Sequence, residues 1–284
     1  MSADDAAPRI HRRRVGDILV TVLCDGYLDA PLEIVRNVPP ADAEAIVRSH
    51  GGRVPLRISV NTFLVQSGGR NALIDTGSGD SMGPTLGQLP RALDAVGVAA
   101  DAIDTVLLTH MHPDHSNGLS DAAGRRLFPN AEVVLHENEI PHWFNDAAMA
   151  RAIESQRTRY FAAARQQIAP YRDRVREFRG GDVFPGVTAI PILGHTPGHT
   201  AYAIASGGDA LLVWGDTVHI PELQVPRPDA TMMFDTDPDA AAASRVRVFD
   251  RVATDRLAVA GMHLHFPGFA RMTKTAGKFL LVAE

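Results

Sequence analysis

Cysteine is almost absent from this 284-residue chain, in which Cys24 is the only one. An internal disulfide is therefore excluded, and so few thiols are more typical of a cytoplasmic protein than of a secreted one. No apolar run approaches the roughly 20 residues that a membrane-spanning helix needs. Three arginines at positions 12–14 precede the apolar segment 18–24, as in a signal peptide, but Asp17 and Asp25 flank that segment and its pattern predicts a first β-strand. We therefore expect a cytoplasmic location and no membrane partner.

Positive charge is also in short supply. Asp and Glu outnumber Lys and Arg by 33 to 28, for a formal net charge of −5, and the arginines at 12–14 form the only basic run. Proteins that bind nucleic acid usually present a basic face to the phosphates, so an RNA-processing nuclease is disfavoured and no nucleic-acid partner is expected. A hydrophobic content of 45% with 6% aromatic residues is ordinary for a globular protein with a large core. A single domain over residues 1–284 is expected.

The segment 109–115, Thr-His-Met-His-Pro-Asp-His, is the most informative feature that is present. It places His110, His112, Asp114 and His115 within six positions, directly after an apolar run at 106–108 that is typical of a buried strand. Imidazole nitrogens suit zinc and other transition metals, and an added carboxylate suits a second divalent ion beside the first. An ordinary polar loop rarely holds four such side chains, so the segment predicts a metal site.

Three later apolar runs of strand length also end in glycine and residues that commonly bind metals. The run 187–193 leads into Gly-His-Thr-Pro-Gly-His at 194–199, the run 211–214 into Gly215 and Asp216, and the run 257–260 into Gly-Met-His ending at His263. Glycine and proline fix the backbone of such loops, so a loop can aim a side chain with little residual freedom. Four strand ends with the same ligand chemistry are predicted to converge on one site.

This pattern resembles the metallo-β-lactamase-fold hydrolase superfamily, and the resemblance covers most of the chain. The family motif is His-x-His-x-Asp-His, followed by a lone His, an Asp and a last His, each at a strand end. The resemblance implies an α/β (α+β) fold, a four-layer αββα sandwich. It implies one ion held by His110, His112 and His199, a second held by Asp114, His115 and His263, and Asp216 as the bridge between them. Asp75, in a strand-Asp-Thr-Gly element, would orient a ligand, and His195 is interpreted as a structural residue of its own loop.

Differences between this chain's motifs and those of other branches of the superfamily narrow the expected activity. Zinc β-lactamases usually have Cys where this chain has Asp216, and di-iron members replace the second motif His with Glu, whereas this chain has His112. Segments 215–219, 233–238 and 261–268 resemble the methyl parathion hydrolase-like branch, which also contains N-acyl-homoserine lactone lactonases. The resemblance implies a hydrolase of lactones, esters or phosphotriesters. Lactone ring opening is favoured, and a phosphotriesterase or aryl esterase is the alternative.

The implied mechanism uses two divalent metal ions per chain, with Zn²⁺ expected and Mn, Fe or Co as alternatives. Two such ions lower the pKa of a shared water from about 16 towards about 7, which makes a bridging hydroxide available to attack the substrate. Asp216 would hold the bridge and Asp114 would keep the second ion bound. His219, where many lactonases of a neighbouring branch carry Tyr, either donates a proton to the leaving group or packs beside the ligands. A non-catalytic protein with the same ligands is the remaining alternative.

Apolar runs predict strands near residues 18–24, 58–66, 72–75, 105–109, 131–136, 187–193, 201–205, 210–214 and 257–260, and helices at 41–49, 86–96 and 238–253. Residues 141–179 are predicted to be a helical insertion. Its aromatic side chains, Trp143, Phe144, Tyr160, Phe161 and Tyr171, either pack the insertion onto the body or face the site as a substrate wall. Residues 32–56 are a candidate rim, or a contact arm of a homodimer.

Overall fold

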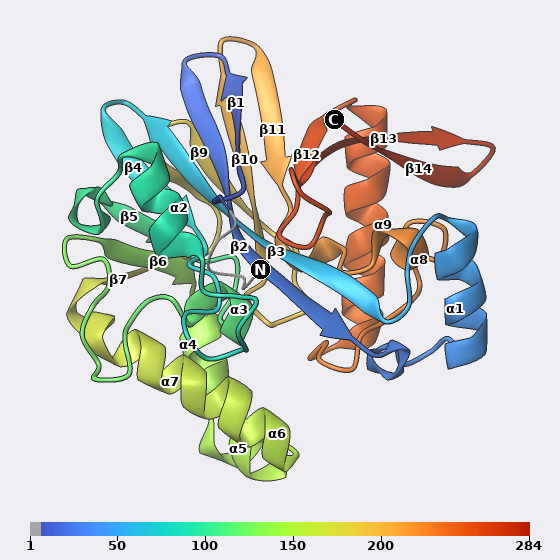
Figure 1. The fold of residues 1–284 in the computed structure, drawn as a ribbon, viewed down its shortest axis with the longest axis horizontal. Helices are drawn as coiled ribbons and strands as arrows, with labels where there is room; N and C mark the ends of the chain where they lie inside the picture. Colours follow the sequence, from blue (N-terminus) through green and yellow to red (C-terminus); the bar gives the residue numbers. More distant parts are fainter. Residues whose placement is uncertain (1–6) are drawn as a thin grey trace.

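Two seven-stranded sheets lie face to face in the computed structural model, which describes residues 7–284 (Figure 1). The first sheet runs in chain order: β1 (Ile10–Val15), β2 (Ile18–Ala30), β3 (Leu56–Ser67), β4 (Arg70–Ile74), β5 (Thr105–Leu107), β6 (Glu132–His136) and β7 (Val175–Phe178). The second runs in reverse order: β14 (Lys278–Ala283), β13 (Phe269–Thr275), β12 (Ala258–Ala260), β11 (Asp209–Val213), β10 (Thr200–Ser206), β9 (Val187–Pro191) and β8 (Gly181–Phe184). The helices lie outside both sheets, so the predicted four-layer αββα sandwich is confirmed.

The helices fall into three groups. The outer face of the first sheet is covered by α2 (Leu89–Val96), α3 (Pro113–Ser116), α4 (Glu139–Trp143) and α7 (Ala163–Ile168), with α5 (Asp146–Arg151) and α6 (Glu154–Gln156) beyond them (Figure 1). The second sheet is covered by α9 (Pro238–Thr254), and α1 (Pro40–Ser49) packs against α8 (Pro221–Gln224). A π-helix spans Arg157–Ala162, and 3-10 turns span Leu32–Ile34, Ala100–Ala102, Ala169–Arg174 and Gly215–Thr217.

The core follows from the alternation of side chains along each strand. In the first sheet, Phe63 and Ile74 face the second sheet, whereas their neighbours Leu64 and Leu73 face the helices. Successive residues of most central strands are therefore buried on opposite faces of the sheet, so both faces are covered. The outcome is the continuous apolar run that made these strands predictable from the sequence.

The long helix α9 has the start that its sequence predicts. Asp237 caps it by accepting a hydrogen bond from the Ala240 N–H, and Pro238 occupies the first position. Val248, Phe249 and Val252 of this helix pack against the second sheet, whereas Val246 is exposed.

The region predicted as a helical insertion is helical only as far as Arg174. It then enters β7, which pairs in parallel with β6. No helix in the described part of the chain is long and apolar enough to cross a membrane.

The topology places several loops at one edge of the sandwich. Strands β4, β5, β6 and β7 are parallel neighbours, as are β11 and β12, so within each set the carboxyl ends lie at the same edge. The loops that follow β4, β5, β11 and β12 carry Asp75, the 109–115 segment, Asp216 and His263. The sequence therefore positions its polar strand ends together by sheet topology.

Candidate metal centre

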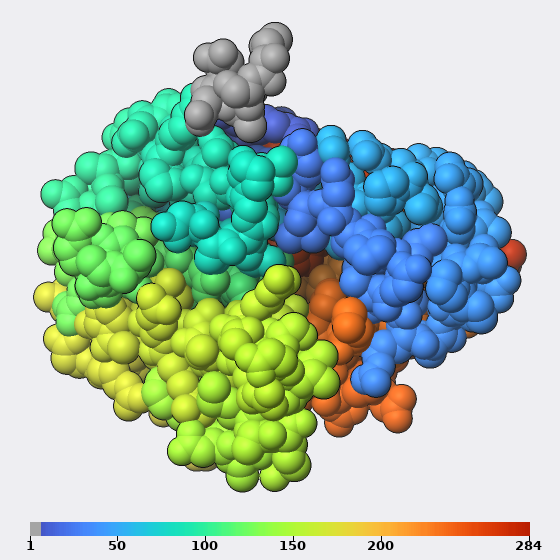
Figure 2. Space-filling model, turned by 60° about the horizontal axis from the view of Figure 1, so that its bottom comes forward, coloured from blue at the N-terminus to red at the C-terminus, as the bar shows by residue number. Residues whose placement is uncertain are grey.

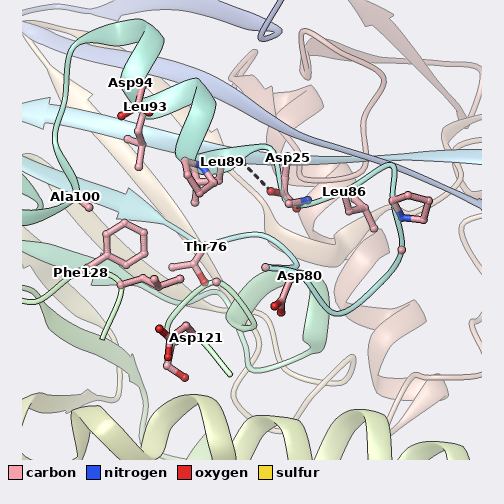
Figure 3. Close-up of a pocket in the computed structure, with 18 residues that line it drawn as sticks. Asp25, Thr76, Asp80, Leu86, Leu89, Leu93, Asp94, Ala100, Asp121 and Phe128 are labelled. Atoms are coloured by element: carbon pink, nitrogen blue, oxygen red, sulfur yellow. Dashed lines mark hydrogen bonds between the residues drawn. The ribbon is translucent and has the colours of Figure 1, made fainter. Parts of the chain in front are cut away.

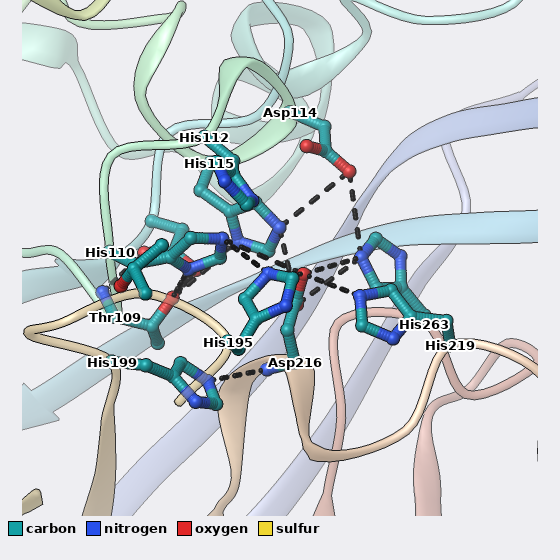
Figure 4. A network of polar contacts seen from close by, with 12 residues as sticks. Thr109, His110, His112, Asp114, His115, His195, His199, Asp216, His219 and His263 are labelled. Carbon is teal, nitrogen blue, oxygen red and sulfur yellow. Dashed lines mark hydrogen bonds and ion pairs between the residues drawn. The ribbon is translucent and has the colours of Figure 1, made fainter. Parts of the chain in front are cut away.

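The residues predicted to bind metal gather where these loops meet (Figure 4). His110, His112, Asp114 and His115 come from the loop after β5, Asp216 from the turn after β11, and His263 from the loop after β12. All of them except Asp114 are buried, and the Asp114 side chain is 16% exposed. Six of the predicted ligands are thus brought together from segments up to about 150 residues apart in the chain.

The Asp216 carboxylate lies at the centre of the cluster. Ring nitrogens of five histidines lie near its two oxygens: His195 at 3.1 Å, His219 at 3.0 Å and His110 at 3.6 Å from Oδ2, and His115 and His263 each at 3.2 Å from Oδ1. One carboxylate has far fewer lone pairs than this arrangement presents nitrogens. The crowding is understandable if cations sit between the carboxylate and the rings.

Potential ligand atoms fall into three overlapping groups, within each of which they lie no more than 4.8 Å apart. One group is His110, His112, His195 and Asp216, the second is Asp114, His115 and His263, and the third is Asp216, His219 and His263. Asp216 is shared by two of the groups, and so is His263. The arrangement therefore suits two neighbouring ions with Asp216 between them.

Buried atoms without partners support the fit to metal ions. Among the described residues, His115 Nε2 and Asp216 Oδ1 are buried and have no hydrogen-bond partner. Such orphaned polar atoms are rare in folded proteins because desolvation without a partner is costly. Both atoms face the cluster, and imidazole nitrogen with carboxylate oxygen is a donor set that Zn²⁺ and related ions prefer.

Electrostatics in the cluster also favour cations. Burial alone would lower the pKa of His115, but the carboxylates of Asp216 and Asp114 raise it well above its usual value. Burial would likewise raise the pKa of Asp216, but His115 and His263 hold it well below its usual range. Protons and divalent cations compete for the same ligand atoms, so a bound metal can replace the protons that this cluster attracts.

Outer hydrogen bonds aim the histidine rings. Asp75 Oδ2 lies 2.7 Å from His115 Nδ1, and Asp235 Oδ1 lies 2.7 Å from His195 Nδ1. The Ser59 carbonyl oxygen lies 2.8 Å from His263 Nδ1. Each contact engages Nδ1 and leaves Nε2 directed at the cluster, which is how such partners tune metal sites. Asp75 has the orienting position expected from the sequence, whereas Asp235 was not predicted.

His195 and His199 exchange the roles predicted for them. His195 Nε2 lies 3.1 Å from Asp216 Oδ2 and 3.2 Å from His110 Nε2, inside the cluster. His199 does not reach the cluster, because its Nε2 accepts a hydrogen bond from the Asp216 backbone N–H and its Nδ1 lies 3.2 Å from the Ile192 carbonyl oxygen (Figure 4). The assignment of His199 as a ligand and of His195 as a structural residue is therefore corrected.

The physical reason lies in the loop between β9 and β10. Gly194, with φ of +135°, turns the chain at the third position after β9, and the next residue, His195, faces the cluster. His199 is the last residue before β10, and its carbonyl oxygen accepts a hydrogen bond from Ile192 N–H. Its ring packs behind the site against Gly215, where an added Cβ would lie 2.5 Å from His199 Nε2.

The remaining two histidines of the C-terminal third lie at different depths. His219 is buried, its ring stacks on His263 at an interplanar angle of 23°, and its Nδ1 has no hydrogen-bond partner among the described residues. His219 therefore lies within the cluster, beside Asp216 and His263. His265 is exposed, and its Nε2 lies 2.6 Å from Glu222 Oε1 at the rim.

Glu139 is a buried residue that the sequence analysis missed. Its Oε2 accepts hydrogen bonds from the Met111 N–H and from Trp143 Nε1, and its Oε1 accepts them from the Thr196 hydroxyl and the Gly198 N–H. One carboxylate therefore joins the loop that carries His110 and His112 to the loop that carries His195. The Glu-x-x-x-Trp spacing in α4 puts both residues on one helix face, but the loops they contact could not be read from the sequence.

Replacing Glu139 with glutamine is expected to loosen both loops. In either orientation the amide NH₂ faces two buried donors, and each unpaired donor costs about 1–3 kcal/mol. We expect a lower melting temperature and a roughly 10- to 100-fold weaker metal affinity, measured by chelator competition. Glu137→Gln is the control, because Glu137 only pairs with the exposed Arg179. Wild-type metal affinity in Glu139→Gln would contradict this role.

Two cavities open beside the cluster. One, of about 300 Å³, is lined by His112 and by side chains of the insertion, including Trp143, Tyr160 and Phe161, with Phe234 opposite them. The other, of about 270 Å³, is lined by His219, Glu222 and His265 together with Arg53, Arg57 and other residues of the 32–56 region and β3. Figure 2 shows the surface hollowed where the insertion, the 32–56 region and the segment after β11 meet. Side chains of both regions therefore line cavities beside the cluster.

A larger cavity lies elsewhere. A space of about 710 Å³ lies between α2 and the loops around residues 76–87 and 118–128 (Figure 3). Its lining is mainly apolar, and the buried Asp25 reaches it while accepting hydrogen bonds from the N–H groups of Ser78, Gly87 and Leu89. None of the candidate ligands lines this cavity. Its size therefore does not make it the reaction site.

Comparisons with known proteins agree with this geometry. The family model of the metallo-β-lactamase superfamily matches residues 56–263. The chain belongs to this superfamily. The family and fold predicted from the sequence are thereby confirmed, and the matched relatives and structures of the superfamily include hydrolases.

Two solved structures resemble the whole chain. The hydrolase AbOPH of the β-lactamase superfamily is 30% identical, with a TM-score of 0.91 and 99% of each chain covered. AidC, a dizinc quorum-quenching lactonase solved with a product, N-hexanoyl-L-homoserine, is 25% identical with the same score and coverage. A hydroxyacylglutathione hydrolase of Acidiphilium cryptum is 30% identical over 177 residues, 60% of this chain and 55% of the relative. The chain spans less than two thirds of the length of the curated relatives it matches, 65% for the first of them.

Proposed function

We propose that this protein is a binuclear metal-dependent hydrolase of small molecules, and specifically a lactonase. The observation that carries the proposal is the Asp216 carboxylate, which is shared between two groups of ligand atoms and has a buried oxygen with no hydrogen-bond partner. We assign the first ion to His110, His112 and His195, the second to Asp114, His115 and His263, and the bridge to Asp216. Zn²⁺ is the proposed metal, because nitrogen-rich donor sets favour it over Mg²⁺ or Ca²⁺.

When bound, two such ions would supply a water-derived nucleophile at neutral pH and Lewis-acid stabilisation of the substrate oxygen. The protein's own side chains then have to position the substrate and limit its contact with water. Trp143, Phe161 and Phe234 form an apolar boundary of the cavity beside His112, and His219 lines a second cavity beside the cluster. A small ester group over the cluster could therefore extend an apolar substituent towards the insertion.

A lactone suits this arrangement because its leaving oxygen stays tethered to the acyl part. Both products of ring opening remain in one molecule, so one binding mode serves the whole reaction. The likeness over the full chain to AidC, described as a dizinc quorum-quenching lactonase, supports lactones as the substrate class. An aryl esterase or phosphotriesterase is the second candidate, which the aromatic boundary near His112 favours because it could pack against an aryl group.

A chelator-controlled substrate panel tests the proposal. We expect hydrolysis of acyl-homoserine lactones and aliphatic lactones with a specificity constant above those for p-nitrophenyl acetate and methyl parathion. Activity should vanish on dialysis against chelator and return with Zn²⁺, and elemental analysis should approach about two ions per chain. A higher specificity constant for methyl parathion than for every lactone would favour the second candidate. Full metal with no turnover of any substrate would favour a non-catalytic protein. Homodimer formation and a cytoplasmic location stay predictions.

A further inference from the structure

Tyr160 occupies an unusual backbone segment beside the metal centre. It lies in the π-helix Arg157–Ala162, which interrupts the helical part of the insertion between α6 and α7. π-helices are rare, and within α-helices they occur frequently at functional sites because the extra residue shifts the direction of the side chains that follow. The side chains of this segment are therefore candidates for a functional role.

The Tyr160 ring reaches a candidate metal ligand. Its centroid lies 5.0 Å from that of His112, with the two rings perpendicular at 89°. Tyr160 also lines the 300 Å³ cavity next to the cluster, together with His112 and Phe234. The residue is thus part of the boundary of the space that a substrate over the cluster would occupy.

The Tyr160 hydroxyl differs from the polar groups of the neighbouring aromatic residues, which make hydrogen bonds within the protein. Trp143 Nε1 donates to Glu139, and the Tyr171 hydroxyl donates to the carbonyl oxygens of Leu119 and Phe128. For the Tyr160 hydroxyl, the described residues provide no hydrogen-bond partner. The ring is half-buried, so this donor stands at the cavity without a structural role in the fold.

A tyrosine hydroxyl is a hydrogen-bond donor. Because the Tyr160 side chain lines the cavity beside His112, its hydroxyl can donate to an oxygen of a substrate in that cavity.

We propose that the Tyr160 hydroxyl donates a hydrogen bond to the substrate oxygen that gains negative charge during hydrolysis. This inference rests on the proposed function and assigns a residue outside the ligand set to it. In ester or lactone hydrolysis, water adds to the carbonyl carbon and loses a proton while the carbonyl π electrons move to the carbonyl oxygen. The C=O bond then re-forms as the C–O bond to the leaving oxygen breaks, and the leaving oxygen takes up a proton. A neutral donor at that oxygen stabilises the charge without transferring a proton.

Tyr160→Phe removes the hydroxyl and keeps the ring that packs against His112. Loss of one such donor costs about 100- to 1000-fold in kcat where the donor is fully engaged. Because Tyr160 lines the site from one side and stays partly exposed, we expect a loss of about 10- to 100-fold in kcat, with KM changed much less. Metal content and melting temperature should stay at the wild-type values. Binding of an alkyl phosphonate, whose oxygens carry the charge, should weaken by about 10-fold, measured by calorimetry.

Tyr171→Phe is the matched control within the same insertion. It removes a hydroxyl that holds the backbone at Leu119 and Phe128, so it should lower the melting temperature and leave kcat near the wild-type value. An active wild-type protein together with unchanged kcat and phosphonate affinity in Tyr160→Phe would overturn this inference alone. A loss of metal in Tyr160→Phe would also overturn it, because the role would then be to support His112. A wild-type protein inactive on every substrate would overturn the proposed function and this inference with it.

Discussion

Replacing Asp216 with alanine is expected to remove both metal ions and abolish turnover. Asp216 belongs to two of the three groups of ligand atoms, and five histidine nitrogens lie within 3.6 Å of its oxygens. Loss of the carboxylate therefore removes the shared ligand together with the negative charge that offsets the two cations. Elemental analysis should fall from about two ions per chain to well below one, and the loss of kcat/KM should exceed the roughly 10- to 100-fold typical of outer partners.

Two further variants make this test specific. Asp216→Asn keeps the size and one carbonyl oxygen but removes the charge, so we expect an intermediate metal affinity. Asp209→Ala is the control, because Asp209 is an exposed carboxylate at the opposite end of the same strand, β11. Asp209→Ala should retain full metal and full activity. Near-normal turnover with full metal in Asp216→Ala would show that the ligand assignment is wrong.

The fold could be predicted where a strand is buried on both sides. β11 appears in the sequence as a continuous apolar run and β3 as a largely apolar one, and the structure places both near the predicted positions. β14 was missed because it alternates between exposed and half-buried residues, and Leu280 and Val282 are more than half exposed. β7 was missed because it lies at the end of a helical segment, and only its pairing with β6 makes it a strand.

The candidate site could be predicted where ligands follow strand ends closely. The loop after β5 gave His110, His112, Asp114 and His115 because their spacing leaves few alternatives. Glu139 and Asp235 could not be predicted, because each contacts a partner from a distant part of the chain. Asp235 contacts His195, 40 positions away, and Glu139 contacts Thr196, 57 positions away. Contacts between residues so far apart in the chain depend on the fold and cannot be predicted from local sequence patterns.

The pair His195 and His199 shows the same limit within a single loop. Both follow glycine, both are 2% exposed, and both lie in the loop between β9 and β10. Which ring faces the metals depends on where the loop turns and which backbone groups need partners. The turn at Gly194 directs His195 inward. The His199 ring instead accepts a hydrogen bond from the Asp216 N–H and contacts the Ile192 carbonyl oxygen. The spacing of the two histidines does not show which one faces the metals, but substitution of each can test it.

His195→Ala is expected to remove a ligand, whereas His199→Ala is expected to remove a support. His195→Ala should lose the first ion and lower kcat/KM by more than the roughly 10- to 100-fold typical of an outer partner. His199→Ala leaves the Asp216 N–H without its acceptor, so it should lower the melting temperature and weaken metal affinity by no more than that range. Metal titration and thermal unfolding of both variants separate the two roles. Loss of one ion in His199→Ala, with full metal in His195→Ala, would return the ligand assignment to His199.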